Sequence, residues 1–117
     1  MTAGRIISKS ISRADLRSMA EAQFGDWIKA VVDVSRGIMG VGGDLHADDE
    51  ALLLERGSRQ QDLWGINLYL EEDGPDWIEF DSLINIRPGQ GNRSRGVDDA
   101  SARERIRALV ESLVVAE

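Results

Sequence analysis

Three arginines and three glycines lie within a ten-residue segment, residues 87–96, of an otherwise acidic chain. The 117-residue protein has a formal net charge of −7, whereas residues 82–97 contain no acidic residue and three arginines. Arginine presents a planar fork that matches phosphate or carboxylate, and glycine lets backbone N–H groups approach a ligand closely. Residues 87–97, called the Arg/Gly loop below, are therefore predicted to bind an anion. The candidate ligand-binding residues are Arg87, Gln90, Asn92, Arg93, Ser94 and Arg95.

The loop arginines have an alternative use inside the protein. They can pair with the protein's own carboxylates, such as Glu79 or Asp81, and the loop is then part of the scaffold. Asp98 and Asp99 follow the loop where a helix is expected to begin, and they would compete with a bound anion. The Lys-Ser/Thr ending of a phosphate-binding P-loop is missing. Both ligand binding and internal pairing therefore stay open.

Acidic residues form a second group of candidates. If the predicted hairpins share one sheet, Asp33, Glu79 and Asp81 point to its polar face. Converging carboxylates could hold Mg²⁺ or Mn²⁺, and a metal beside an arginine loop would suit phosphoryl transfer. Alternating acidic residues are also typical of a solvated sheet face, which is the favoured interpretation.

His46 is the only histidine, and it lies among acidic residues that include Asp44 and Asp48. A neighbouring carboxylate would orient its ring for acid–base catalysis, which makes His46 a catalytic candidate beside Asp33, Glu79 and Asp81. A structural role at the start of the next helix is the favoured interpretation. With one histidine and no cysteine, we expect no metal site and no cofactor.

The elements that must position these residues are predicted from apolar periodicity and from capping residues. Ser12 and Asp15 predict the start of a first helix, and Gly25 predicts its end. The further predicted elements are a hairpin of strands 26–34 and 38–45, a helix over 48–54, a hairpin of strands 64–70 and 77–87 that Pro88 ends, and a helix from Asp98 or Asp99 to Val114.

This order predicts an α+β, two-layer single domain over residues 1–117, with elements in the order α-β-β-α-β-β-α. Its mostly antiparallel sheet of about four strands, from two hairpins, carries three helices on the apolar face and leaves the other face polar. Trp64 is expected in the core, whereas Trp27 and Trp77 are expected at an exposed contact surface. Arg87 lies an even number of positions after Glu79 in the predicted strand, so both side chains are expected on the polar face. The Arg/Gly loop is therefore expected to continue that face.

Several blocks of the sequence resemble a known family. They are GGDLHAD (42–48), EALLLE (50–55), LWGINLY (63–69), IEFDS (78–82), INIRP (84–88) and QGNRSRGV (90–97). They resemble a small prokaryotic family that is classed only as a domain of unknown function. The resemblance covers roughly residues 24–97. It implies a single soluble domain, and it implies no reaction, cofactor or catalytic residue.

Composition limits the classes of function. The isoelectric point near 4.7 disfavours broad binding of duplex nucleic acid. Short apolar runs and the lack of a secretory signal favour a cytoplasmic protein without membrane contact. The favoured hypothesis is a binding module for an anionic small molecule, nucleotide or acidic protein segment. The alternatives are a homo-oligomeric assembly protein and a small metal-dependent phosphoesterase or nuclease, so whether the protein is an enzyme stays open.

Overall fold

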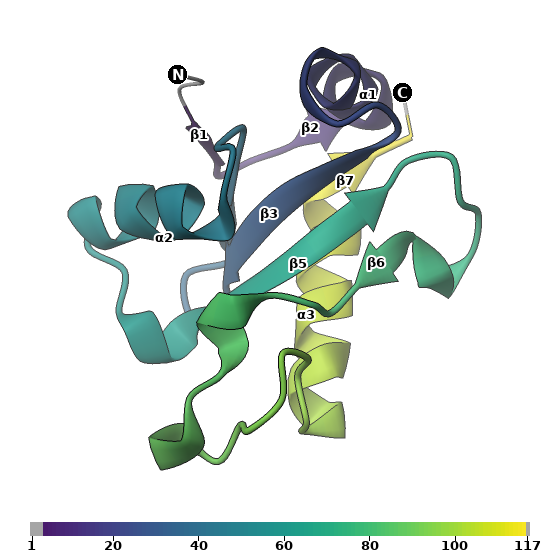
Figure 1. Ribbon diagram of the computed structural model, residues 1–117. Helices are drawn as coiled ribbons and strands as arrows, with labels where there is room; N and C mark the ends of the chain where they lie inside the picture. The colour runs from purple at the N-terminus through teal and green to yellow at the C-terminus, as the bar shows by residue number, and fades with distance from the viewer. Residues whose placement is uncertain (1–3, 117) are drawn as a thin grey trace.

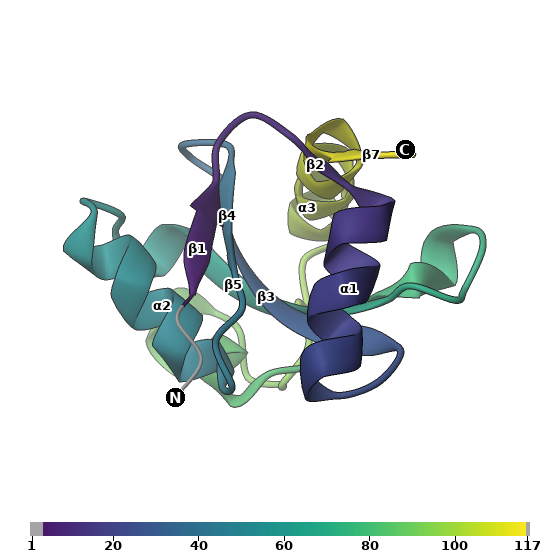
Figure 2. The same cartoon turned by 90° about the horizontal axis from the view of Figure 1, so that it is seen from above.

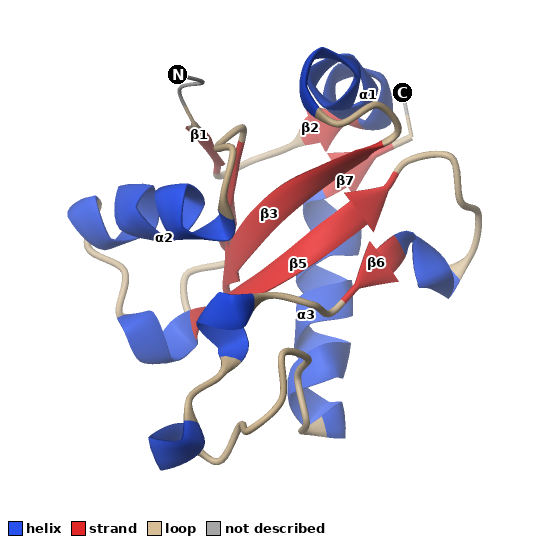
Figure 3. Ribbon diagram, in the orientation of Figure 1, coloured by secondary structure: helices blue, strands red, loops and turns tan. Residues whose placement is uncertain are grey.

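The computed structural model describes residues 4–116, which form three α-helices, seven β-strands and four short 3₁₀ helices (Figures 1 and 3). The α-helices are α1 (Arg13–Gln23), α2 (His46–Glu55) and α3 (Ala100–Leu113). The strands are β1 (Arg5–Ile7), β2 (Ile11–Ser12), β3 (Trp27–Asp33), β4 (Ile38–Val41), β5 (Leu63–Tyr69), β6 (Ile78–Glu79) and β7 (Val114–Val115). The 3₁₀ helices are η1 (Gln60–Asp62), η2 (Pro75–Trp77), η3 (Leu83–Asn85) and η4 (Pro88–Gln90).

The main sheet has five strands in the order β1-β4-β3-β5-β6, and every neighbouring pair is antiparallel. The predicted α+β class with three helices and a mostly antiparallel sheet is therefore confirmed, with β1 as an additional strand. The central pair β3–β5 joins the two predicted hairpins, and its register places Lys29 opposite Asn67. Asn67 in turn lies opposite Glu79 of β6. Strands β2 and β7 form a separate parallel pair.

Helix α1 begins and ends where the sequence predicts. The Ser12 hydroxyl accepts a hydrogen bond from the backbone N–H of Asp15 at 3.0 Å, which satisfies one of the free donors of the first turn. Leu16 and Ala20 are fully buried on one face of the helix. Gly25 follows the helix with a φ of +108°, a conformation that glycine adopts without strain.

Helix α3 is also placed by its cap. The Asp99 carboxylate accepts from the N–H of Ser101 at 3.1 Å, and the buried side of the helix carries an apolar stripe that includes Ile106 and Val110. Of the helices in residues 4–116, none has the length and apolar character required to cross a membrane.

The helices lie on both faces of the sheet (Figure 2). Helices α1 and α3 cover the face that buries Ile28, Ala30 and Ile66, where most of the core lies. Helix α2 packs on the opposite face through Leu53, which contacts a smaller apolar cluster that includes Val31. The prediction that all helices share one face is wrong for α2. Because α2 covers only part of its face, the remainder over β3, β5 and β6 stays open.

The predicted strand 77–87 is wrong beyond Glu79, where β6 ends. At this point the chain approaches Gly65 of β5 so closely that a Cβ on Gly65 would lie 2.6 Å from Ser82. The Asn85 side chain then takes the place of a paired strand. Its Oδ1 accepts from the Gly65 N–H at 2.8 Å and its Nδ2 donates to the Gly65 carbonyl at 3.0 Å. The chain therefore continues as η3 and η4 rather than as a strand.

The three tryptophans occupy different environments. Trp64 is buried, as expected. Trp77 is also buried, with 6% of its surface exposed, and the Arg13 guanidinium lies 4.4 Å from its ring centroid. The prediction of an exposed Trp77 is wrong because this residue belongs to η2 and not to an alternating strand. Trp27 is half-buried and remains available on the open part of the sheet.

Candidate functional site

A cleft of about 430 Å³ lies on the open part of the sheet, within the size range of small-molecule sites. Its floor and walls come from β3, β5 and β6, from the start of α2, from residues 81–84, and from Arg95 of the Arg/Gly loop. Leu45 and Leu83 also line the cleft, and both are more than half exposed. The cleft therefore joins elements that are distant in the sequence.

One wall of the cleft is aromatic. The rings of Trp27 and Tyr69 lie opposite each other on β3 and β5, with centroids 5.8 Å apart, and Phe24 extends this stack at 4.6 Å from Trp27. The Lys29 ammonium lies 4.8 Å from the centroids of both Phe24 and Trp27. This wall offers a flat apolar surface with a cation beside it, an arrangement suited to a planar ring that carries negative charge.

The floor of the cleft carries a chain of polar side chains across β5 and β6. Asn67 Nδ2 donates to Glu79 Oε1 at 2.9 Å and to the backbone carbonyl of Asp81 at 3.2 Å. The Tyr69 hydroxyl donates to the same Glu79 oxygen at 3.1 Å. Burial and the Glu79 carboxylate raise the pKa of Tyr69, so its hydroxyl keeps its proton. Glu79 and Asp81 therefore both line the cleft.

His46 reaches this cleft as the first residue of α2. Its Nε2 lies 2.8 Å from the carbonyl oxygen of Ile66, and because a carbonyl only accepts, Nε2 carries a proton. Burial lowers the pKa of His46, and Lys29 acts in the same direction, whereas the hydrogen bonds to the Ile66 carbonyl and to the Asn67 side chain oppose this shift. The imidazole is therefore neutral near pH 7, and its Nδ1 is a hydrogen-bond acceptor.

The start of α2 supplies free backbone donors beside His46. The residue before the helix is Leu45, whose side chain cannot accept a hydrogen bond. Asp48 Oδ2 accepts from the Leu45 N–H at 3.0 Å. The N–H groups of His46 and Ala47 have no acceptor among the described residues, and both residues line the cleft. Such N–H groups, aligned with the helix dipole, favour a negative charge.

Within the Arg/Gly loop, most of the predicted ligand-binding residues bond to the protein itself. Asn92 is buried and donates to the carbonyl oxygens of Asn85, Ser94 and Gly96. Asp98 accepts hydrogen bonds from the Ser94 hydroxyl and from the Arg93 N–H. Both bonds lower the pKa of Asp98, and the Ser94 bond has the larger effect. Internal bonding therefore shapes this segment.

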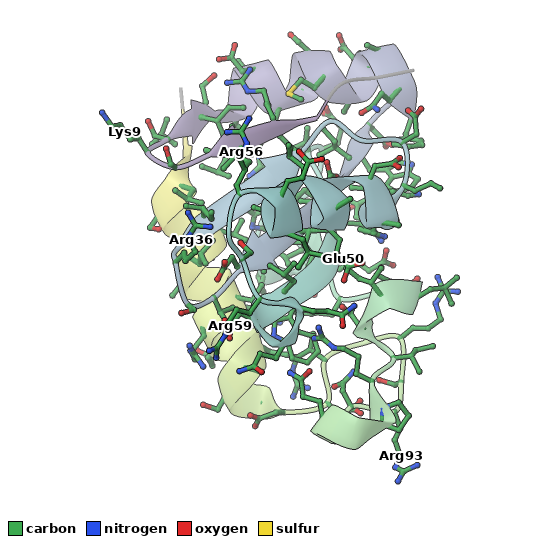
Figure 4. All side chains as sticks on the ribbon, turned by 90° about the vertical axis from the view of Figure 1, so that its left-hand side faces the viewer. Lys9, Arg36, Glu50, Arg56, Arg59 and Arg93 are labelled. Carbon is green, nitrogen blue, oxygen red and sulfur yellow. The ribbon has the colours of Figure 1, made fainter. Side chains whose placement is uncertain are left out.

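The loop arginines point in three directions. Arg95 reaches the cleft, where its Nε lies 2.6 Å from Asp81 Oδ1. Arg87 instead lies with its guanidinium 4.3 Å from the Trp64 ring centroid and donates to the Gln60 carbonyl. Arg93 points away from the body of the protein (Figure 4) and makes no side-chain bond to residues 4–116.

The expectation that Arg87 continues the polar face is wrong. Strand β6 ends at Glu79, so the alternation of side chains that would have placed Arg87 on that face does not reach it. Gln90 follows Arg87 away from the cleft and donates to the Gln61 carbonyl at 2.7 Å. Of the predicted ligand-binding residues, Arg95 is the one that lines the cleft.

Asp33 does not join the other carboxylates. It lies opposite Leu63, four residues along β3 from Lys29, and it is fully buried. Its Oδ1 accepts from the N–H groups of Ser35 and Arg36 at 2.9 Å, which closes the turn between β3 and β4. Its Oδ2 accepts from the Ser58 hydroxyl at 2.6 Å. The predicted convergence of Asp33 with Glu79 and Asp81 is therefore wrong, and no group of three acidic or histidine residues in 4–116 is placed to hold a metal ion.

Lys29 and Tyr69 are not among the predicted ligand-binding residues, although both lie at polar-face positions of predicted strands. The missing information was the register of β3 against β5, which places Lys29, Asn67 and Glu79 in one row across the sheet. Alternation along one strand carries no information about such a row.

The sequence model of a family described as "Protein of unknown function (DUF5674)" matches residues 5–113. The chain belongs to this family. The DUF5674 match includes every element that lines the cleft, from Trp27 to Arg95, and it assigns no activity to them. No curated protein and no solved structure matches the chain.

Proposed function

We propose that this DUF5674 protein is a binding module for a small anionic ligand that carries a planar ring. The observation that carries the proposal is the cleft itself. It combines an aromatic wall at Trp27 and Tyr69, the cations Lys29 and Arg95, and the N–H groups at the start of α2. Each of these features comes from a different part of the chain, and the fold brings them to one opening.

The cations favour an anionic group in two ways. Lys29 forms no ion pair with a described residue, so its charge is available to a ligand. Arg95 pairs with Asp81, but both side chains are about half exposed, and such an exposed pair contributes under about 1 kcal/mol. An anion can therefore recruit the Arg95 guanidinium at small cost. The proposal keeps the predicted anion ligand and assigns it to the cleft rather than to the whole Arg/Gly loop.

Two arginines of the same loop give a matched test. Arg95 lines the cleft, whereas Arg93 points into solvent, so the Arg95→Ala and Arg93→Ala variants remove equal charge at different places. Thermal shift and isothermal titration calorimetry would compare inorganic phosphate, adenosine and adenosine 5′-monophosphate (AMP). Saturation at a hundredfold the dissociation constant stabilises the folded protein by about 2.7 kcal/mol.

We expect AMP to bind more tightly than either phosphate or adenosine, because it carries both the ring and the anion. Arg95→Ala should weaken AMP binding about tenfold or more, whereas Arg93→Ala should leave it unchanged. Equal losses in the two variants would indicate general attraction by the loop and contradict a site in the cleft. If neither AMP nor the two fragments bind, the proposal is wrong for this class of ligand.

The assembly hypothesis had two arguments, an exposed Trp77 and the open sheet face, and the first is wrong because Trp77 is buried. The open sheet face that formed its other argument is the same surface that contains the cleft. Homo-oligomer formation stays a prediction, and size-exclusion chromatography with light scattering, with and without AMP, would test it.

A further inference from the structure

Glu79 is the acidic side chain of the cleft that lacks a cationic partner among the described residues. It is exposed and forms no ion pair, whereas Asp81 beside it pairs with Arg95 at 2.6 Å. Lys29 is too distant to neutralise it. The two residues stand on either side of Asn67 in the row across β3, β5 and β6, and neighbouring strands about 4.8 Å apart place their backbones about 10 Å from each other. An unpaired negative charge therefore lies at the same opening as the cations.

Two neighbours hold the Glu79 carboxylate in a defined position. Its Oε1 accepts from Asn67 Nδ2 at 2.9 Å and from the Tyr69 hydroxyl at 3.1 Å, whereas its Oε2 accepts from no described residue. A carboxylate has about four positions for accepted hydrogen bonds, so about half of this capacity stays free. Because Glu79 is exposed and lines the cleft, a ligand there can reach it.

This carboxylate sets a condition on an anionic ligand. A negative group drawn into the cleft by Lys29 and Arg95 also approaches Glu79, which repels it unless the ligand brings a donor to that side chain. A hydroxyl group is such a donor and adds no charge of its own. Hydrogen bonds from a hydroxyl to a carboxylate are stronger than those between neutral groups, and dinucleotide-binding proteins use an acidic residue for a ribose hydroxyl in this way.

We infer that the ligand carries a hydroxylated sugar whose O–H groups donate to Glu79. The inference rests on the proposed function, since it selects among ring-bearing anions. Glu79 thereby determines specificity: it favours ligands in which a sugar joins the ring to the anion over ring-bearing anions without hydroxyl groups. The ligand class is a planar heterocycle linked through a ribose to a phosphate.

A pair of nucleotides that differ only in the sugar hydroxyls tests this inference. AMP carries both hydroxyls, whereas 2′,3′-dideoxyadenosine 5′-monophosphate (ddAMP) has the same ring and phosphate without them. Calorimetric titration of the wild-type protein should give AMP about a tenfold or greater advantage, because a site that binds a hydroxyl rejects the analogue that lacks it.

Two glutamate variants assign this preference to Glu79. Glu79→Gln keeps an oxygen that accepts from Asn67 and Tyr69 but removes the charge, so ddAMP should bind more tightly and the preference for AMP should fall to about threefold or less. Glu72→Gln makes the same change at an exposed position outside the cleft and should keep the wild-type preference.

The nucleotide comparison in the wild-type protein does not depend on any variant. Equal wild-type affinities for AMP and ddAMP, with both bound, would overturn the role of Glu79 and leave the proposed function standing. An unchanged preference in Glu79→Gln would do the same. Absence of binding by every nucleotide at millimolar concentration would overturn both.

Discussion

Asn92 shows how one side chain can order a segment that has no regular structure. The two hydrogens of its amide nitrogen are shared among three backbone carbonyls, at 2.8 Å to Asn85, 3.2 Å to Ser94 and 2.8 Å to Gly96. Its Oδ1 accepts from the N–H of Asp98 at 2.8 Å. Contacts from one buried residue to four backbone groups therefore connect the two ends of the Arg/Gly loop and hold Arg95 toward the cleft.

Replacing Asn92 by alanine should destabilise the protein by about 2–4 kcal/mol, because several buried backbone groups lose their partner at once. Urea unfolding followed by far-UV circular dichroism measures this change. Gln90→Ala is the matched control, since Gln90 is exposed and its side chain makes one bond, to Gln61, so the expected loss is under about 1 kcal/mol. A stability of Asn92→Ala within 0.5 kcal/mol of the wild type, roughly the scatter of surface variants, would contradict this role.

His46 should titrate below its ordinary pKa of 6.5, because burial disfavours the imidazolium. Long-range ¹H–¹⁵N NMR spectra should show the tautomer protonated at Nε2, the atom that donates to Ile66. The pKa of His46 is lower in the folded than in the unfolded protein, so the stability it contributes is present above pH 6.5 and is lost as the pH falls through the lowered value. A pKa above 6.5, or protonation at Nδ1 alone, would be inconsistent with the structure.

At the scale of the element, α2 holds a buried carboxyl group against the sheet. Asp49 is fully buried, and its Oδ1 accepts from the Gly43 N–H at 3.0 Å, while its Oδ2 has no partner among the described residues. A Cβ on Gly43 would lie 2.9 Å from that Oδ1, so only glycine permits this approach. Burial raises the pKa of Asp49 to about 7, with Asp48 acting in the same direction and the Gly43 bond opposing it.

The protein should therefore lose stability as the pH rises through neutrality. Between pH 3.8 and about 7 the folded protein keeps a proton on Asp49 that the unfolded chain releases. Across this range the free energy of unfolding falls by at most about 1.4 kcal/mol per pH unit as the pH rises. Asp49→Asn should remove this slope in urea-unfolding curves recorded across that range. Glu55→Gln, at an exposed position of the same helix, should keep it. An unchanged slope in Asp49→Asn would show that this carboxyl is not protonated in the folded state.

The elements that the sequence predicted well are those whose signals are local. Ser12, Gly25 and the turn at 35–37 act within a few residues of themselves, so α1 and the β3–β4 hairpin follow from them. Residues 77–87 also alternate, yet they do not form a strand. Their conformation depends on Asn85 binding Gly65, twenty residues earlier, and alternation along a single segment cannot show this.

At the scale of the whole molecule, the cleft exists because α2 covers only part of one sheet face. The sequence predicted a polar face with Glu79 and Asp81, and it selected Arg95, which lines the cleft, as one of six candidate ligand-binding residues. It could not predict that Asp33 lies apart or that Arg87 turns toward Trp64, since both depend on register and on where β6 ends. The types of residue in the candidate site can thus be read from the sequence, whereas their arrangement in space depends on strand pairing.

The three tryptophans provide the most direct test of the cleft as the binding site. Trp27 lines the cleft of about 430 Å³, whereas Trp64 and Trp77 line two other, smaller depressions of about 250 and 240 Å³. Each indole N–H gives one signal in a ¹H–¹⁵N correlation spectrum, and single Trp→Phe variants assign the three signals. Titration with AMP should shift the Trp27 signal and leave the other two in place. A shift of Trp64 or Trp77 with Trp27 unmoved would place the ligand elsewhere and contradict the proposal.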